Sequence, residues 1–185
     1  MLSSLFRVIN TFDITLMKII NRPFNPMINS AALLSIYLMY FVIMLVFYYL
    51  YFEKKWKLIK KYAISAIFGF ATVYTLKYIV KRPRPDIFPL VEKIDPSFPS
   101  SHAFFSGFLL YISRHEEIPS YLKIISLVFS LLIPFIKVYI GVHYPTDVII
   151  GFILGYLFPG MLYDKILSKI GSIKLKRIVK NKRNK

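Results

Sequence analysis

The chain has 185 residues, of which 56% are hydrophobic, and its mean hydropathy of +0.55 lies well above that of ordinary soluble proteins. It contains no cysteine, so disulfides, thiolate metal sites and cysteine nucleophiles are excluded. The net charge of +16 at pH 7 would suit nucleic acid, but the 25 basic residues gather at the ends of apolar segments, as in membrane proteins. We therefore expect a membrane-embedded chain.

The first 20 residues predict an amphipathic helix. Their apolar positions recur at intervals of three and four, and polar residues fill the other face. The apolar set is Leu2, Leu5, Phe6, Ile9, Phe12, Leu16 and Ile20, and the polar set is Arg7, Asn10, Asp13 and Lys18. Such a helix is typical of the membrane interface, and a sixth crossing is the alternative. No small-residue cleavage pattern follows it, so we expect it to be retained.

Five apolar segments predict an all-α fold, a polytopic membrane helical bundle of five to six spans. The clearest is Ser30–Phe52, which has no charged residue and is long enough to cross a hydrocarbon core of ~30 Å. The others are residues 62–80, 100–113, 124–142 and 148–163. The segment 100–113 is short for a crossing. If it did not cross, His102 and His143 would lie on opposite faces, about 30 Å apart. We therefore expect it to cross, with its helix extending through Arg114 and Glu117.

Basic residues mark the two membrane faces. Sixteen lie in residues 53–61, 114–123 and 165–185, and eight lie in the N-terminal segment and residues 77–93. The positive-inside rule makes the first group cytoplasmic. We therefore expect a single membrane-embedded domain, residues 1–164, and a basic cytoplasmic tail, residues 165–185. The tail has no aromatic residues for base stacking, so we expect it to meet anionic lipid headgroups and not nucleic acid.

The first of three motifs joins an apolar segment to the longest loop. The loop, residues 82–99, contains five prolines and is predicted not to be helical. Lys77 lies near the end of the preceding helix, where a charge needs a partner, a cavity or the headgroup zone; snorkelling to the interface is the simple alternative. Arg84 follows seven residues later. A compact ammonium and a planar guanidinium together suit a tetrahedral anion.

The second motif, Pro99-Ser100-Ser101-His102, precedes an apolar run. Ser100 is a natural N-cap, and the N–H groups at a helix start favour phosphate. A histidine on that first turn could donate a proton to a leaving oxygen. A merely capped helix is the alternative.

The third motif contains Lys137, His143 and Asp147. Gly141 is expected to end the incoming helix, and Pro145 to open the next one. A carboxylate four residues after His143 can hold one ring nitrogen protonated and aim the lone pair of the other outward. The alternative is an interfacial histidine beside a capping aspartate.

Together the three motifs resemble those of the type 2 phosphatidic acid phosphatase superfamily, whose pattern is Lys-x6-Arg-Pro, Pro-Ser-Gly-His and Ser-Arg-x5-His-x3-Asp. The resemblance spans Lys77 to Asp147, and all three spacings match. The chain departs from the pattern at three positions. Ser101 stands in place of glycine, and Ile136-Lys137 in place of Ser-Arg, so the cation at 137 keeps its charge but loses the bidentate fork.

The resemblance implies a fold and a mechanism. It makes His143 the nucleophile, Asp147 its orienting partner and His102 the general acid, with a phosphohistidine intermediate and no metal or other cofactor. The residues expected to bind phosphate are Lys77, Arg84, Ser100, Ser101 and Lys137. The charge distribution puts these residues on the face with fewer basic residues, so we expect an active site on the extracytoplasmic face of the cell membrane.

The function expected is hydrolysis of a lipid phosphate or diphosphate, with a polyprenyl diphosphate such as undecaprenyl or dolichyl diphosphate as the leading substrate and the monophosphate as product. Phosphatidic acid and phosphatidylglycerol phosphate are alternatives. A different alternative is a non-catalytic membrane protein that binds anions or lipids. The oligomeric state is not predicted by the sequence.

Overall fold

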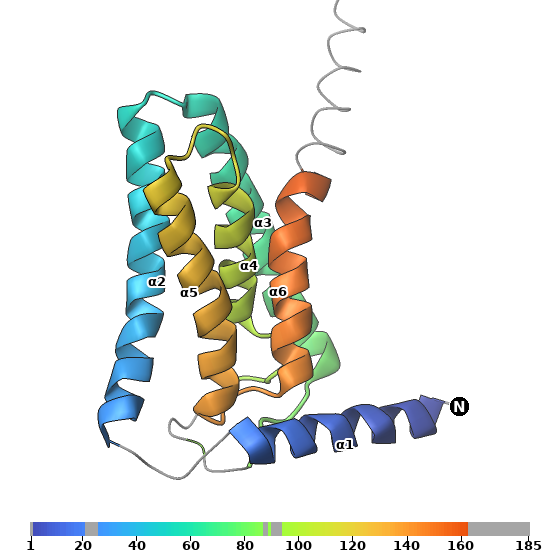
Figure 1. Cartoon of the computed structure of the whole chain (residues 1–185). Helices are drawn as coiled ribbons and strands as arrows, with labels where there is room; N and C mark the ends of the chain where they lie inside the picture. Colours follow the sequence, from blue (N-terminus) through green and yellow to red (C-terminus); the bar gives the residue numbers. More distant parts are fainter. Residues whose placement is uncertain (1, 21–25, 87–88, 90–93, 163–185) are drawn as a thin grey trace, which may run out of the picture.

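The computed structural model describes residues 2–20, 26–86, 89 and 94–162. Within these residues it contains helices and no strand, which confirms the all-α prediction. The helices are α1 (Leu2–Ile20), α2 (Pro26–Phe52), α3 (Trp56–Val80), α4 (Ser101–Ser113), α5 (Ser120–Tyr139) and α6 (Pro145–Pro159) (Figure 1). The predicted basic tail, residues 165–185, lies outside the described residues.

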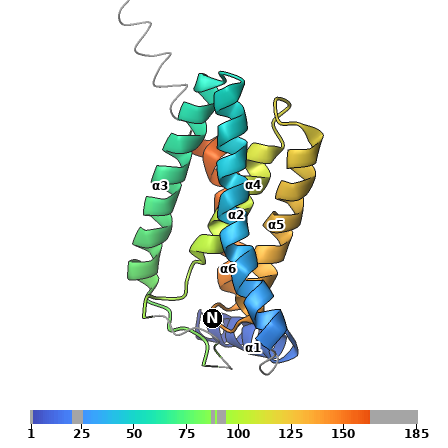
Figure 2. The same ribbon diagram turned by 90° about the vertical axis from the view of Figure 1, so that its left-hand side faces the viewer.

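Helices α2 to α6 form an upright bundle with α4 in the middle (Figures 1 and 2). Four stretches in the described residues are long and apolar enough to span a membrane: Ala32–Phe52, Trp56–Val80, Ser120–Tyr139 and Pro145–Leu162. Helix α4 packs against all four of the helices that carry them. The chain is therefore a multi-pass membrane protein with a helical bundle, as predicted.

Helix α4 is shorter than predicted. It ends at Ser113, and the N–H groups of His115 and Ile118 then turn back to the carbonyls of Ile112 and His115. The expectation that the helix continues through Arg114 and Glu117 was wrong. Ile118 precedes a proline, which disfavours helical angles at that residue, so the chain turns into α5. Glu117 instead binds Lys55 of the α2–α3 turn at 2.7 Å.

Small residues let α4 and α6 approach closely. A Cβ atom on Gly155 would collide with the carbonyl of Phe104, and one on Gly107 would collide with the carbonyl of Phe152. Where α4 begins, a Cβ on Gly151 would collide with the carbonyl of Ser100. Membrane helices commonly use small residues in this way. The contact fixes the N-terminal ends of α4 and α6, which carry two of the motifs, against each other.

The buried core and the outer surface are both apolar. Met39, Phe108 and Ile133, from α2, α4 and α5, are fully buried in the centre of the bundle. Large side chains such as Phe41 and Ile67 are more than half exposed on its outside. Exposed apolar surface on this scale suits contact with lipid tails rather than with water.

Helix α1 lies across one end of the bundle and not parallel to the spans (Figure 1). This confirms the predicted helix and agrees with an interfacial position. The predicted polar face was wrong at Asp13, which is fully buried against the bundle together with Met17, whereas Phe12 is 48% exposed. The buried carboxylate binds the first turn of α6, a long-range contact that the spacing within α1 does not reveal.

Candidate active site

All three motifs lie at the end of the bundle that α1 crosses, and the predicted breaks explain why. Lys81 adopts the left-handed conformation (φ 50°) after α3, and Gly141 does so (φ 73°) after α5. Ser100 caps α4 by accepting a hydrogen bond from the N–H of Ala103 at 3.4 Å, and Pro145 opens α6. The end of α3, the α5–α6 turn and the starts of α4 and α6 therefore converge.

Arg84 is the centre of the charged cluster. Its Nη1 donates to the carbonyl of Val142 at 2.7 Å and lies 3.4 Å from Nε2 of His143. Lys77, although it belongs to the spanning helix α3, is only 1% exposed, and its Nζ donates to the carbonyl of Pro96 at 2.5 Å. A buried lysine paired in this way does not snorkel to the interface, so the simple alternative for Lys77 was wrong.

Asp95 holds both cations, and sequence reasoning did not identify it. One carboxylate oxygen binds Nη2 of Arg84 at 2.7 Å and the other lies 3.1 Å from Nζ of Lys77; the Asp95 carbonyl also accepts from Nε of Arg84 at 2.8 Å. Burial alone would raise the pKa of Asp95, but the hydrogen bonds from Lys77 and Arg84 hold that pKa below its usual range. A phosphate that binds both cations must therefore displace an ionised carboxylate.

His143 is buried in the turn between α5 and α6. Burial lowers its pKa to about 4, and the positive charges of Arg84 and Lys77 act in the same direction, against the attraction of Asp147. The ring is therefore neutral at pH 7. Because a guanidinium can only donate hydrogen bonds, the nitrogen beside Arg84, Nε2, is the one that offers a lone pair, and the proton belongs on Nδ1. The lone pair faces the cations.

Asp147 caps α6, one of the two roles that the sequence left open, and its carboxylate also lies beside the ring of His143. Its Oδ2 accepts from the backbone N–H of Tyr144 at 3.1 Å, which caps α6, and lies 3.7 Å from Nδ1 of His143. That second distance is longer than a hydrogen bond, and Nδ1 has no hydrogen-bond partner among the described residues. A small movement of the ring would close it. The other carboxylate oxygen, Oδ1, binds Arg82 at 2.7 Å.

The remaining predicted residues lie at the start of α4 and on the last turn of α5. The N–H of Ser100 donates to the carbonyl of Asp147 at 3.0 Å, and Ser101 opens α4. His102 lies on the same first turn, half-buried, with its ring 5.8 Å from that of Tyr40. Lys137 is buried on the last turn of α5, where its carbonyl accepts from the N–H of His143 at 3.3 Å.

Side-chain contacts therefore link Arg84, His143 and Asp147, and Asp95 joins Lys77 to Arg84. Ser100 and Lys137 join this group through the backbone. Sequence reasoning missed Asp95, Arg82 and Asp13. The one available signal was the second Arg-Pro pair, Arg82-Pro83, immediately before Arg84.

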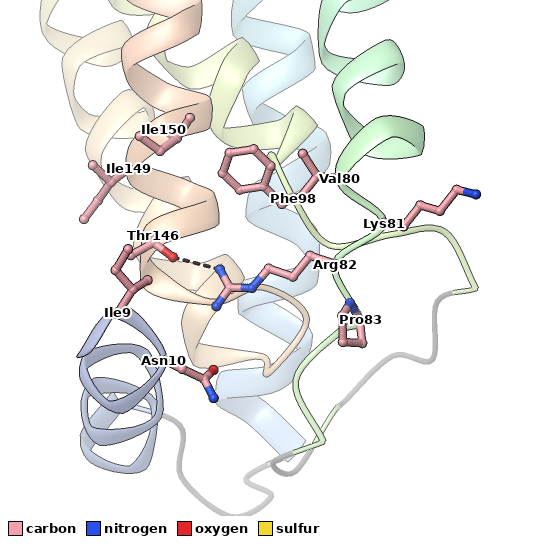
Figure 3. A pocket seen from close by; sticks show the side chains of 10 residues that line it. All are labelled: Ile9, Asn10, Val80, Lys81, Arg82, Pro83, Phe98, Thr146, Ile149 and Ile150. Atoms are coloured by element: carbon pink, nitrogen blue, oxygen red, sulfur yellow. Dashed lines mark hydrogen bonds between the residues drawn. The ribbon is translucent and has the colours of Figure 1, made fainter. Parts of the chain in front are cut away.

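A cavity of about 420 Å³ lies beside the site, between α1, the end of α3 and the start of α6 (Figure 3). Apolar side chains such as Ile9, Phe98 and Ile150 line much of it, and Arg82 extends across it to Thr146. The cavity touches neither Arg84 nor His143. It is lined instead by Arg82 and Thr146, and Arg82 in turn binds Asp147.

Comparison with known proteins identifies the family of this chain. The profile of the PAP2 superfamily matches residues 56–167, which is more than half of the chain. Phosphatidylglycerophosphatase B of Bacillus subtilis (strain 168) is 37% identical over 94 residues, covering 44% of this chain and 45% of that protein. Undecaprenyl-diphosphatase of Sulfolobus acidocaldarius is 28% identical over 105 residues, covering 52% and 51%. The chain thus spans about half the length of these relatives.

Two solved structures share the fold. The crystal structure of Aquifex aeolicus LpxE has a TM-score of 0.70 at 23% identity and covers 80% of this chain and 92% of that one. The PAP2-type phosphatidylglycerolphosphate phosphatase from Bacillus subtilis has a TM-score of 0.68 at 23% identity, covering 86% and 88%. Because the PAP2 profile matches more than half of the chain, we conclude that this chain belongs to the PAP2 superfamily.

Proposed function

We propose that the protein is an integral-membrane lipid phosphatase that works through a phosphohistidine. The observation that carries the proposal is the contact between Nε2 of His143 and Arg84, 3.4 Å apart, in a ring that burial keeps neutral. A neutral imidazole with its lone pair beside fixed cations is what attack on a phosphate requires. Family membership supports the same chemistry.

In the first step Nε2 of His143 attacks the phosphorus while Arg84 and Lys77, released from Asp95, bind the phosphate oxygens. The N–P bond forms and the P–O bond to the lipid breaks, and the leaving oxygen takes a proton from His102. Positive charges fixed around the phosphate stabilise the transition state. The proton on Nδ1 of His143 stays with the ring, and Asp147 stabilises the positive charge that it gains.

In the second step water replaces the histidine. His102, now neutral, accepts a proton from the water as its oxygen attacks the phosphorus, and the N–P bond breaks. Inorganic phosphate leaves, and both histidines return to their starting states. Ser101, through its N–H, and Lys137 supply the further contacts to the phosphate that the motif pattern assigns to them.

The substrate proposed is a lipid phosphate or diphosphate, with a polyprenyl diphosphate as the leading candidate. The names of the two relatives support this class, since one is a phosphatidylglycerophosphatase and the other an undecaprenyl-diphosphatase. Phosphatidic acid and phosphatidylglycerol phosphate are the other candidates.

We also propose that the site faces away from the cytoplasm. Five lysines, at positions 54, 55, 57, 60 and 61, lie in or beside the α2–α3 turn, at the opposite end of the bundle from the site (Figure 1). The positive-inside rule assigns that end, and with it the basic tail, to the cytoplasm.

Phosphate release by purified protein tests the activity. We expect release from undecaprenyl diphosphate, phosphatidic acid or phosphatidylglycerol phosphate, inhibition by vanadate and little effect of EDTA. His143→Asn should abolish release, whereas His115→Asn, at the opposite end of the bundle, should retain it. Equal activity in a correctly folded His143→Asn variant would contradict the proposal.

A second candidate function is binding of anionic lipid without hydrolysis. Asp95 favours it, because this carboxylate already neutralises Lys77 and Arg84. Saturable binding of the same lipids by the wild-type protein, without phosphate release from any of them, would support this candidate.

A further inference from the structure

Arg82 makes a second charged cluster beside the site, with partners from α1 and from the first turn of α6. Its Nη1 binds Oδ1 of Asp147 at 2.7 Å and the hydroxyl of Thr146 at 2.8 Å, and its Nη2 binds Oδ2 of Asp13 at 2.6 Å. Both carboxylates are fully buried, and the Arg82 side chain is only 13% exposed. Arg82 thus links α1, the loop after α3 and the first turn of α6.

Asp13 also caps α6 from a distant part of the chain. Its Oδ1 accepts from the backbone N–H of Thr146 at 2.9 Å, and its Oδ2 accepts from the Thr146 hydroxyl at 2.6 Å. A carboxylate at a helix N-terminus satisfies an otherwise unpaired N–H group and is stabilised by the helix dipole. The capped residue immediately precedes Asp147, so α1 acts on the backbone that carries the orienting carboxylate. Figure 3 shows α1 beside Thr146 and Arg82.

We propose that Arg82 and Asp13 are positioning residues for the reaction and that α1 is part of the active site. This inference rests on the proposed phosphatase function. Arg82 holds one oxygen of Asp147, which leaves the other aimed at Nδ1 of His143, 3.7 Å away. The Tyr144 N–H holds that second oxygen at 3.1 Å, so the carboxylate is fixed at both ends.

The charges of Arg82 and Asp13 predict the effect of replacing each residue. Arg82 stands between two buried carboxylates, so an uncharged residue at 82 leaves both of them unpaired, which is strongly destabilising. Asparagine at position 13 leaves no buried charge unpaired, because Arg82 and Asp147 still bind each other. Asp13→Asn is therefore the variant expected to fold, and it tests the position of Asp147 without removing its partner.

A purely structural role of Arg82 and Asp13 predicts a different result from a positioning role. If the two residues only stabilise the fold, replacing them lowers the folded fraction but leaves the folded molecules equally active. A positioning residue lowers kcat in folded protein with little change in KM, because phosphate still binds Arg84 and Lys77. It also changes the protonation pattern of the His143 ring, which a remote structural role does not.

The experiment compares Asp13→Asn, Arg82→Lys and Arg82→Met with Lys81→Gln, a neighbouring exposed cation outside both clusters. After size-exclusion and thermal checks of folding, phosphate release from a lipid phosphate is measured. We expect kcat to fall about 10–100-fold in Asp13→Asn, as for a misplaced catalytic group, with KM changing less than about three-fold. Arg82→Lys should retain more activity than Arg82→Met, and Lys81→Gln should match the wild type.

A second readout is ¹⁵N NMR of histidine-labelled protein, with His143 assigned from the loss of its signals in His143→Asn. We expect the Nδ1–H form in the wild type and a mixture of tautomers in Asp13→Asn or Arg82→Met. Wild-type kcat and an unchanged tautomer in folded Asp13→Asn and Arg82→Lys would overturn the inference. If the wild type itself releases no phosphate, the proposed function fails instead, and the two failures are distinguishable.

Discussion

At the residue scale, the contacts of Asp95 show what phosphate has to replace. Arg84 uses all three guanidinium nitrogens in contacts with Asp95, Val142 and Pro96, and Lys77 binds the same loop. The site is therefore preorganised around an internal anion. An internal carboxylate keeps the cations from being stranded as unpaired buried charges when no substrate is present.

Replacing Asp95 with asparagine should tighten binding of phosphate. A neutral amide binds Lys77 and Arg84 more weakly than the carboxylate does, so phosphate displaces it at a smaller cost in free energy. We expect KM for the lipid phosphate and the inhibition constant of vanadate to fall, by roughly ten-fold if the loss is about 1.4 kcal/mol. Steady-state kinetics measure both. Asp86→Asn, an exposed aspartate of the same loop, should change neither; weaker vanadate binding in Asp95→Asn would show that Asp95 aligns the cations instead.

His143 should make the fold sensitive to acid. Its pKa of about 4 in the folded protein lies below the unfolded value of 6.5, so the unfolded state binds more protons between these two pH values. Stability is therefore lost as pH falls from about 6.5 to 4, by up to about 3 kcal/mol from this group. Thermal unfolding at pH 7 and pH 4.5 should show the loss. In His143→Asn the difference between the two pH values should shrink, and an identical difference would exclude His143 as its source.

The sequence identified the residues of the candidate site better than it identified the carboxylates that bind them. The His143–Asp147 spacing and the Lys77–Arg84 pair are local patterns, and the structure brings these four side chains together. Asp95 binds Arg84, 11 positions away, across the proline-rich loop, and Asp13 binds Thr146, 133 positions away. Neither belongs to a local motif, so no spacing rule identifies them, and the amphipathic pattern even assigned Asp13 to the wrong face.

At the element scale, the close packing of α4 and α6 aligns the two helix starts. Alanine at Gly155 would bring Cβ against the carbonyl of Phe104, which is backbone and cannot move aside cheaply. We expect Gly155→Ala to destabilise the protein by roughly 2 kcal/mol or more and to lower activity through displaced helix starts. Thermal unfolding and kcat test this expectation.

The matched control is Gly160→Ala, at the end of α6. A Cβ there meets only the ring and hydroxyl of Tyr111, at 3.3 Å and beyond. Its unfolding temperature should stay near that of the wild type. If Gly155→Ala proved equally harmless, the close approach of the two helices would not be what aligns the site.

Helix boundaries were predictable where a single residue sets them. Ser100, Gly141 and Pro145 lie at the ends that their chemistry predicts. The end of α4 was not predictable in this way. A crossing of the full membrane thickness needs a longer helix than the turn before Pro119 allows. Gly151 and Gly155 of α6 have the four-residue spacing that is typical of closely packed membrane helices, but the spacing does not say which helix packs against them.

At the scale of the whole molecule, the proposed topology puts the site and the lysine-rich α2–α3 turn on opposite faces of the bilayer. The chain has no cysteine, so single cysteines at exposed positions can report this directly. With a membrane-impermeant maleimide on intact cells, Asp86→Cys should react at once, and Glu116→Cys only after permeabilisation. The reverse pattern would place the site in the cytoplasm.

The most direct test of the central claim is to trap the phosphorylated enzyme. The wild-type protein is mixed with a lipid that carries ³²P in its terminal phosphate, quenched within one turnover and analysed for label that is stable to base and labile to acid, as phosphohistidine is. The account predicts label on the wild type and on His115→Asn, and none on His143→Asn. Rapid phosphate release without any trapped label, or the same label on His143→Asn, would contradict it.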